Sequence, residues 1–132
     1  MTLRSPPGDA DHPLVLIVDD YAQNRKLARD VLQASGFRTL EAASGAEAIE
    51  LATAHLPDVI LMDLRLPDMD GTSAAWALGR HHRTAAIPVV ALTSVPLAGN
   101  GEAASVFAGC LEKPISVGAF PTQVRGFCEV EA

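Results

Sequence analysis

The sequence predicts a single α/β domain built on a doubly wound parallel sheet. Short apolar runs alternate with helical patterns along the chain, and polar residues stand at the ends of four of these runs. The chain has 132 residues, of which 48% are hydrophobic and 20% charged, as expected for one globular domain. Ligands of such sheets bind beyond the carboxyl ends of the strands.

The first strand and helix have clear signals. Residues 14–18 (LVLIV) form a continuous apolar run that is typical of a strand buried on both faces. Apolar residues then recur at steps of three and four, which predicts a helix over 23–35 with Gly36 as its stop signal. The alternation of FRTLEA predicts a second strand over 37–42.

The middle of the chain continues the alternation. Ser44 and Glu47 have the spacing of a capping box, which opens a helix over 46–55. DVILM predicts a strand over 58–62, and the turn formers of the following loop lead to a helix over 73–78.

The last third has weaker helix signals. IPVVAL and GCLE predict strands over 87–92 and 109–112. The glycines between them favour only a short helix over about 101–107. A last helix follows Ser116, and Pro121 predicts that it starts late.

Five polar residues stand at or just past the ends of the predicted strands: Asp19, Asp20, Asp63, Thr93 and Lys113. The topology of a parallel sheet gathers them at one edge. Three carboxylates at one place repel one another unless a cation lies among them. The expected cation is Mg²⁺, which prefers oxygen ligands, and the lysine would face a bound anion.

Composition excludes several functions. A net charge of −6 with scattered Lys and Arg argues against a nucleic-acid partner. The N-terminal residues 1–12 contain neither a signal peptide nor a membrane anchor and are expected to form a flexible tail. Cys110 and Cys128 lack metal-site spacing and are expected to be reduced, buried thiols of a cytoplasmic protein without membrane contacts.

Four segments together resemble the receiver domain of two-component response regulators: LVLIVDD, PDVILMDLRLPDMDG, IPVVALTS and LEKPIS. The match runs from about 14 to 128, and KPISV is similar to stand-alone, single-domain receivers of the cell-cycle type. The resemblance implies a receiver domain over 13–132 with the flavodoxin-like fold, a five-stranded parallel sheet in the order 2-1-3-4-5.

The resemblance also implies a phosphorelay function. Asp63 would accept a phosphoryl group from a histidine kinase or a histidine phosphotransfer protein and then signal to a partner protein. Asp20 and Asp63 would bind Mg²⁺ directly, Asp19 would act largely through water, and the backbone carbonyl of Arg65 would complete the protein ligands. No turnover of an external substrate is expected, although the phosphoryl group could be lost by autodephosphorylation.

The remaining implied roles concern the rest of the site. Lys113 would pair with the carboxylate and later with the phosphoryl group, and its bond to Pro114 would be cis. Thr93 would be the switch whose hydroxyl contacts the phosphoryl group. On the first helix, Asn24 and Arg25, together with Leu27, are expected to face the kinase.

Two departures from the family pattern keep other functions open. Cys110 stands where receivers commonly have an aromatic switch residue, and the fourth-helix region is short. A receiver-like binding module that works without phosphorylation is therefore an alternative. A phosphohydrolase of the haloacid-dehalogenase type would need an acid two positions after the nucleophile, where this chain has Arg65. The oligomeric state and the specific partners are left open.

Overall fold

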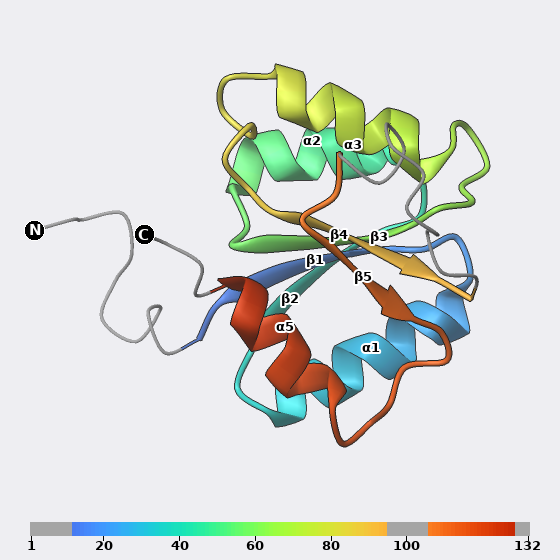
Figure 1. The fold of residues 1–132 in the computed structure, drawn as a ribbon, viewed down its shortest axis with the longest axis vertical. Helices are drawn as coiled ribbons and strands as arrows, with labels where there is room; N and C mark the ends of the chain where they lie inside the picture. The colour runs from blue at the N-terminus through green and yellow to red at the C-terminus, as the bar shows by residue number, and fades with distance from the viewer. Residues whose placement is uncertain (1–11, 95–105, 129–132) are drawn as a thin grey trace, which may run out of the picture.

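The computed structural model describes residues 12–94 and 106–128, and the remaining residues lie outside that description. The described strands form a parallel sheet in the order β2-β1-β3-β4-β5. Helices α1 and α5 cover one face of the sheet, and α2 and α3 cover the other (Figure 1). The predicted fold class and strand order are confirmed.

The strands are close to the predicted ranges: β1 Leu14–Val18, β2 Arg38–Ala42, β3 Val59–Asp63, β4 Val89–Thr93 and β5 Gly109–Glu112. All residues of β3 and β4 are buried, as expected for apolar runs in the interior of a parallel sheet. Both strands extend one residue further than predicted, so Asp63 and Thr93 are the last residues of their strands.

The described helices are α1 Ala22–Ala34, α2 Gly45–His55, α3 Gly71–Arg80 and α5 Phe120–Cys128. Ser44 caps α2 as predicted by accepting from the Glu47 N–H at 3.2 Å, while Glu47 Oε1 accepts from the Ala43 N–H at 2.9 Å. Helix α3 is longer than predicted because Asp70 caps its N-terminus and accepts from the Ser73 N–H at 2.8 Å.

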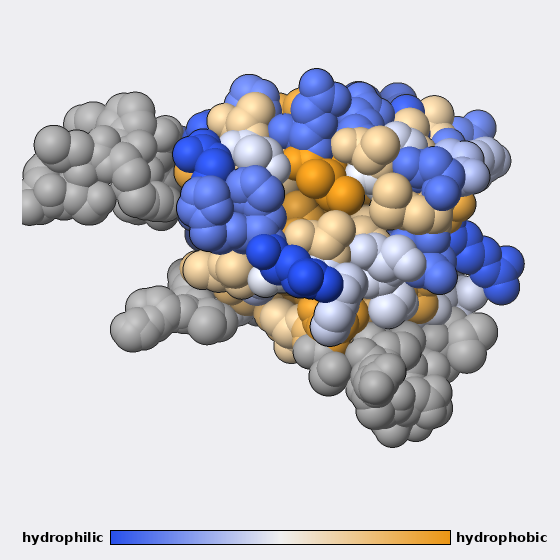
Figure 2. Space-filling view, turned by 90° about the horizontal axis from the view of Figure 1, so that it is seen from above, coloured by the Kyte–Doolittle hydropathy of each residue, from blue (hydrophilic) through white to orange (hydrophobic). Residues whose placement is uncertain are grey.

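Alternate residues of the central strands supply two cores. Leu16 and Ile60 face α2 and α3, while Ile17 and Leu61 face α1 and α5. Figure 2 looks onto the α2 and α3 face, where hydrophobic residues show in the middle and hydrophilic residues surround them. The two cores fix the strand register and thereby the edge at which the polar residues meet.

The last third of the chain differs in part from the prediction. Most of the helix expected over 101–107 lies outside the described residues, and its last two residues, Val106 and Phe107, form a turn. The burial expected for Cys110 is wrong, because this side chain of the edge strand β5 is exposed, and Cys128 is half-buried. The late start of the last helix is confirmed, since α5 begins at Phe120.

None of the helices within 12–94 and 106–128 has the length and apolar character needed to cross a membrane.

Candidate functional site

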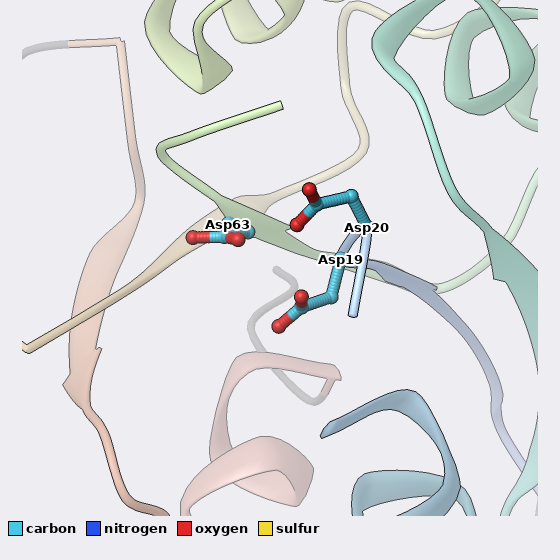
Figure 3. Close-up of side chains that lie close together, drawn as sticks. All are labelled: Asp19, Asp20 and Asp63. Carbon is cyan, nitrogen blue, oxygen red and sulfur yellow. The ribbon is translucent and has the colours of Figure 1, made fainter. Parts of the chain in front are cut away.

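Three carboxylates converge at the carboxyl edge of the sheet. Asp19 and Asp20 follow β1, and Asp63 ends the neighbouring β3, where Val18 and Met62 are register partners. One carboxylate oxygen from each of the three acids lies within 4.8 Å of the others. The Asp20 side chain points toward Asp63 (Figure 3). The predicted gathering of the acids is therefore observed.

Lys113 brings a positive charge to two of these acids from the end of β5. Its Nζ lies 3.2 Å from Asp63 Oδ1 and 3.5 Å from Asp19 Oδ2. The Lys113 backbone N–H also donates to the Thr93 carbonyl at 2.9 Å. The Lys113–Pro114 bond is cis, as the resemblance implied.

The two neighbouring acids after β1 have different surroundings. Asp19 is only 2% exposed, and its carboxylate accepts from the Tyr21 N–H at 2.9 Å and from Asn24 Nδ2 at 3.2 Å. Asp20 is exposed, and its side chain makes no hydrogen bond or ion pair with the part of the chain that the structure describes. Asp19 is thus held by the protein, while the oxygens of Asp20 remain available for a ligand.

The buried position of Asp63 makes its charge costly. Burial, and secondly the negative charge of Asp19, raise the pKa of the Asp63 carboxyl above its ordinary value. The contacts with Lys113 and with the Arg65 N–H, at 3.4 Å, oppose that rise only in part. The three carboxylates offer oxygen atoms as metal ligands, and the single lysine balances only part of their negative charge. The cluster therefore fits a hard divalent cation such as Mg²⁺.

Two further residues shape the site from β4 and α3. Thr93 is buried at the end of β4, and the following Ser94 is exposed. Gly71 packs directly against the phosphoacceptor candidate, because a Cβ atom at this position would lie 2.3 Å from the Asp63 carbonyl oxygen. The start of α3 therefore requires glycine for close packing against the backbone of β3.

Asn24 and Arg25, expected on a kinase-facing surface, also make contacts inside the site that the sequence pattern does not predict. Asn24 donates to the Asp19 carboxylate, and Arg25 Nη1 donates to the Asp19 carbonyl at 2.8 Å. The available signal was their position, five and six residues after Asp19 in the first turn of the helix that follows it.

A pocket of about 350 Å³ lies beside the site between α1 and the residues that follow β5. Its mostly apolar wall includes Leu27, Ala28, Pro114 and Ile115, while Asn24 and Lys113 supply polar groups. Leu27 is 43% exposed, so part of this apolar wall lies at the surface.

Comparison with known proteins gives a consistent result. The family profile described as "Response regulator receiver domain" matches residues 15–125. The polar-differentiation response regulator DivK of Brucella ovis is 39% identical over 116 residues, which cover 86% of this chain and 94% of that relative.

Solved structures of similar fold include the chemotaxis response regulator CheY4 of Vibrio cholerae, with a TM-score of 0.82 and 27% identity over 88% of this chain and 98% of that one. Another is the receiver domain of a Pseudomonas aeruginosa sensor histidine kinase, with a TM-score of 0.80 and 28% identity over 89% of this chain and 98% of that one. The latter has a magnesium ion coordinated in its active-site cleft.

Proposed function

The chain belongs to the response regulator receiver domain family of two-component signalling, whose members are signalling proteins rather than classical enzymes, and on this premise we propose that Asp63 is its phosphoacceptor. The observation that carries the proposal is the position of Asp63 at the end of β3, beside two other carboxylates and 3.2 Å from Lys113 Nζ. The proposed donor is the phosphohistidine of a histidine kinase or a histidine phosphotransfer protein. The domain would span 13–132, and its cytoplasmic location stays a prediction.

In the proposed reaction, a carboxylate oxygen of Asp63 attacks the phosphorus atom of the phosphohistidine. An O–P bond forms, the P–N bond to the donor imidazole breaks, and the bonding electron pair leaves with the imidazole. Because a carboxylate is a weak nucleophile, the protein would contribute mainly positioning and neutralisation of charge. Lys113, whose Nζ lies 3.2 Å from Asp63 Oδ1, would pair with a phosphoryl oxygen after the transfer.

Mg²⁺, when bound, would supply further neutralisation of the negative charge at this edge of the sheet. We assign Asp20 and Asp63 as direct ligands, Asp19 as a ligand through water, and the Arg65 carbonyl as the remaining protein ligand. The hydrogen bonds that already occupy the Asp19 carboxylate support its indirect role, and the open oxygens of Asp20 support a direct one.

Thr93 would report phosphorylation to the rest of the molecule. Its hydroxyl would donate to a phosphoryl oxygen in one conformational state alone, so phosphorylation would favour that state. A downstream protein that binds this state would be the output of the domain. Subsequent attack of water on the phosphoryl group would release inorganic phosphate and restore Asp63, which is the proposed autodephosphorylation.

The proposal is tested by intact-mass measurement after incubation with acetyl phosphate, with and without Mg²⁺. We expect a gain of one phosphoryl group that requires Mg²⁺, that is lost in Asp63→Asn and that is kept in Asp30→Asn, which changes an exposed acid on α1. If the wild-type protein binds Mg²⁺ but gains no mass, the phosphoacceptor proposal fails. That outcome would favour the binding module that works without phosphorylation, to which the exposed Cys110 at the usual aromatic position also points.

A further inference from the structure

Arg25 links the acid cluster to the neighbouring strand β2. From the first turn of α1, its Nη1 donates to the main-chain carbonyl of Asp19 at 2.8 Å, and its Nε lies 3.2 Å from Glu41 Oε1. One turn further along α1, Arg29 Nη1 lies 3.0 Å from the other oxygen of Glu41. Glu41 is thus shared by two arginines, and of these two only Arg25 contacts Asp19.

These contacts are sheltered enough to hold one geometry. The side chains of Arg25 and Glu41 are 19% and 29% exposed, whereas that of Lys26, in an ion pair on the same helix, is 65% exposed. A guanidinium group donates from a planar fork, so it can hold a carboxylate and a carbonyl at the same time. The Asp19 carbonyl, and with it the planar peptide unit that leads to Asp20, is therefore held in place.

A fixed peptide unit at this point determines where Asp20 can reach. The Asp20 carboxylate has no hydrogen bond to residues 12–94 or 106–128 that could orient it, yet it points toward Asp63 (Figure 3). Its direction therefore depends on the backbone that carries it. We propose that Arg25, anchored by Glu41, is a positioning residue that holds Asp20 ready for a divalent cation, an inference that rests on the proposed Mg²⁺ site.

The direction in which Mg²⁺ affinity changes when Arg25 is removed distinguishes a positioning role from a purely electrostatic one. If Arg25 acted only as a positive charge near the acids, its removal would tighten Mg²⁺ binding, because a repulsion between cations would be lost. If Arg25 positions Asp20, its removal weakens Mg²⁺ binding although a repelling charge has gone. Groups that support metal ligands from outside the ligand set typically change metal affinity by roughly 10-fold to 100-fold.

The experiment is calorimetric titration with Mg²⁺ alone of the wild-type protein, Arg25→Gln, Arg25→Lys and Arg29→Gln. Arg29→Gln is the matched control, because it removes the same charge from the same helix and the same Glu41 partner but no contact with Asp19. We expect roughly 10-fold weaker binding in Arg25→Gln, a smaller loss in Arg25→Lys, and unchanged affinity in Arg29→Gln. Glu41→Ala keeps Arg25 and removes the carboxylate that anchors it, so it tests the same link by a separate substitution.

Unchanged or tighter binding in Arg25→Gln would overturn the inference, as would an equal loss in Arg29→Gln. If Arg25→Gln does not fold, as judged by its thermal unfolding curve, an unchanged Mg²⁺ affinity in Glu41→Ala would overturn it. Absence of Mg²⁺ binding by the wild-type protein would overturn the proposed metal site as well as this inference. Wild-type binding that Arg25→Gln leaves unchanged would overturn the inference alone, so the two failures are distinguishable.

Discussion

Asp63, the proposed phosphoacceptor, is buried, and its negative charge lowers the stability of the fold. Its pKa is raised, chiefly by burial and secondly by Asp19, so the folded protein binds this proton more tightly than the unfolded chain does. The free energy of unfolding therefore falls as the pH rises from the ordinary aspartate pKa, about 4, through the raised pKa of the folded state. Without Mg²⁺, the full cost is present once the pH exceeds the raised pKa of the folded state.

We expect Asp63→Asn to raise the melting temperature at pH 7 without Mg²⁺, and we expect the gain to vanish below about pH 4. Thermal unfolding over a range of pH measures both effects. Asp30→Asn is a control of opposite sign, because Lys26 chiefly lowers the pKa of the exposed Asp30 carboxyl. A lower melting temperature for Asp63→Asn at neutral pH would show that its contact with Lys113 outweighs burial.

Thr93 allows the proposed switch to be separated from the proposed chemistry. Thr93→Val has a similar shape but no hydroxyl, so it should still accept a phosphoryl group without stabilising the phosphorylated conformation. A charge-assisted hydrogen bond contributes roughly 1.5–3 kcal/mol, or about one to two decades in the conformational equilibrium. Hydrogen exchange before and after phosphorylation should therefore differ in the wild type and in Thr93→Ser but not in Thr93→Val. An equal difference in all three proteins would remove Thr93 from the switch.

At the scale of elements, helix α3 contains two glycines whose replacement by alanine should change stability in opposite directions. A Cβ atom at Gly71 would lie 2.3 Å from the Asp63 carbonyl oxygen, whereas at Gly79 it would meet nothing within 4 Å. Gly71→Ala should destabilise the protein by about 1–3 kcal/mol through overpacking against β3. Gly79→Ala should instead stabilise it by about 0.5–1 kcal/mol, since alanine has the higher helix propensity. Chemical denaturation measures both changes, and a similar change in the two variants would contradict the packing argument.

Asp68, in the loop after β3, is hydrogen-bonded to the start of α2, a contact that the sequence pattern does not predict. Asp68 accepts from the Gly45 and Ala46 N–H groups at 2.8 and 2.9 Å, and these bonds lower the pKa of its carboxyl. A lowered pKa stabilises the fold above the ordinary pKa, and this contribution is lost as the pH falls through the folded-state pKa.

Asp68→Ala should therefore lower the melting temperature at pH 7, and its difference from the wild type should vanish in acid. Thermal unfolding at both pH values measures the change. Glu50→Gln, on the exposed surface of α2, is the matched control for loss of charge. A loss of stability in Asp68→Ala that persists in acid would show that the carboxylate charge is not its cause.

Strand positions and the edge where the acids meet could be predicted from the sequence, because buried parallel strands are continuous apolar runs and their ends share an edge. The sequence places Asn24 and Arg25 close after Asp19, but the atoms that they contact depend on how α1 is rotated about its axis over β1. The exposure of Cys110 also depends on tertiary structure, because β5 is an edge strand and its sequence does not show which face is covered. Asp70 was a missed local signal, an N-cap residue directly before α3.

For the whole molecule, the acid cluster couples the proposed Mg²⁺ site to the stability of the fold. A cation that binds only the folded state raises the free energy of unfolding with its concentration, by about 2.7 kcal/mol at one hundred times its dissociation constant. Without Mg²⁺, Asp20→Asn should raise stability only slightly, because it relieves repulsion among the acids but the exposed Asp20 side chain is hydrated and makes no hydrogen bond or ion pair with the described residues. It should lose most of the stabilisation by Mg²⁺.

Asp63→Asn should begin more stable than the wild type without Mg²⁺ and gain little from the ion, so the wild type should overtake it as Mg²⁺ is added. Melting temperatures of the three proteins against Mg²⁺ concentration, at constant ionic strength set with NaCl, measure this crossing. The constant ionic strength is needed because the chain carries a net charge of −6 and any cation screens it. Parallel curves for all three proteins would mean that Mg²⁺ acts through general screening. A steep rise in the wild-type curve alone, so that it crosses the curve of Asp63→Asn, would tie the stability of the domain to its acid cluster.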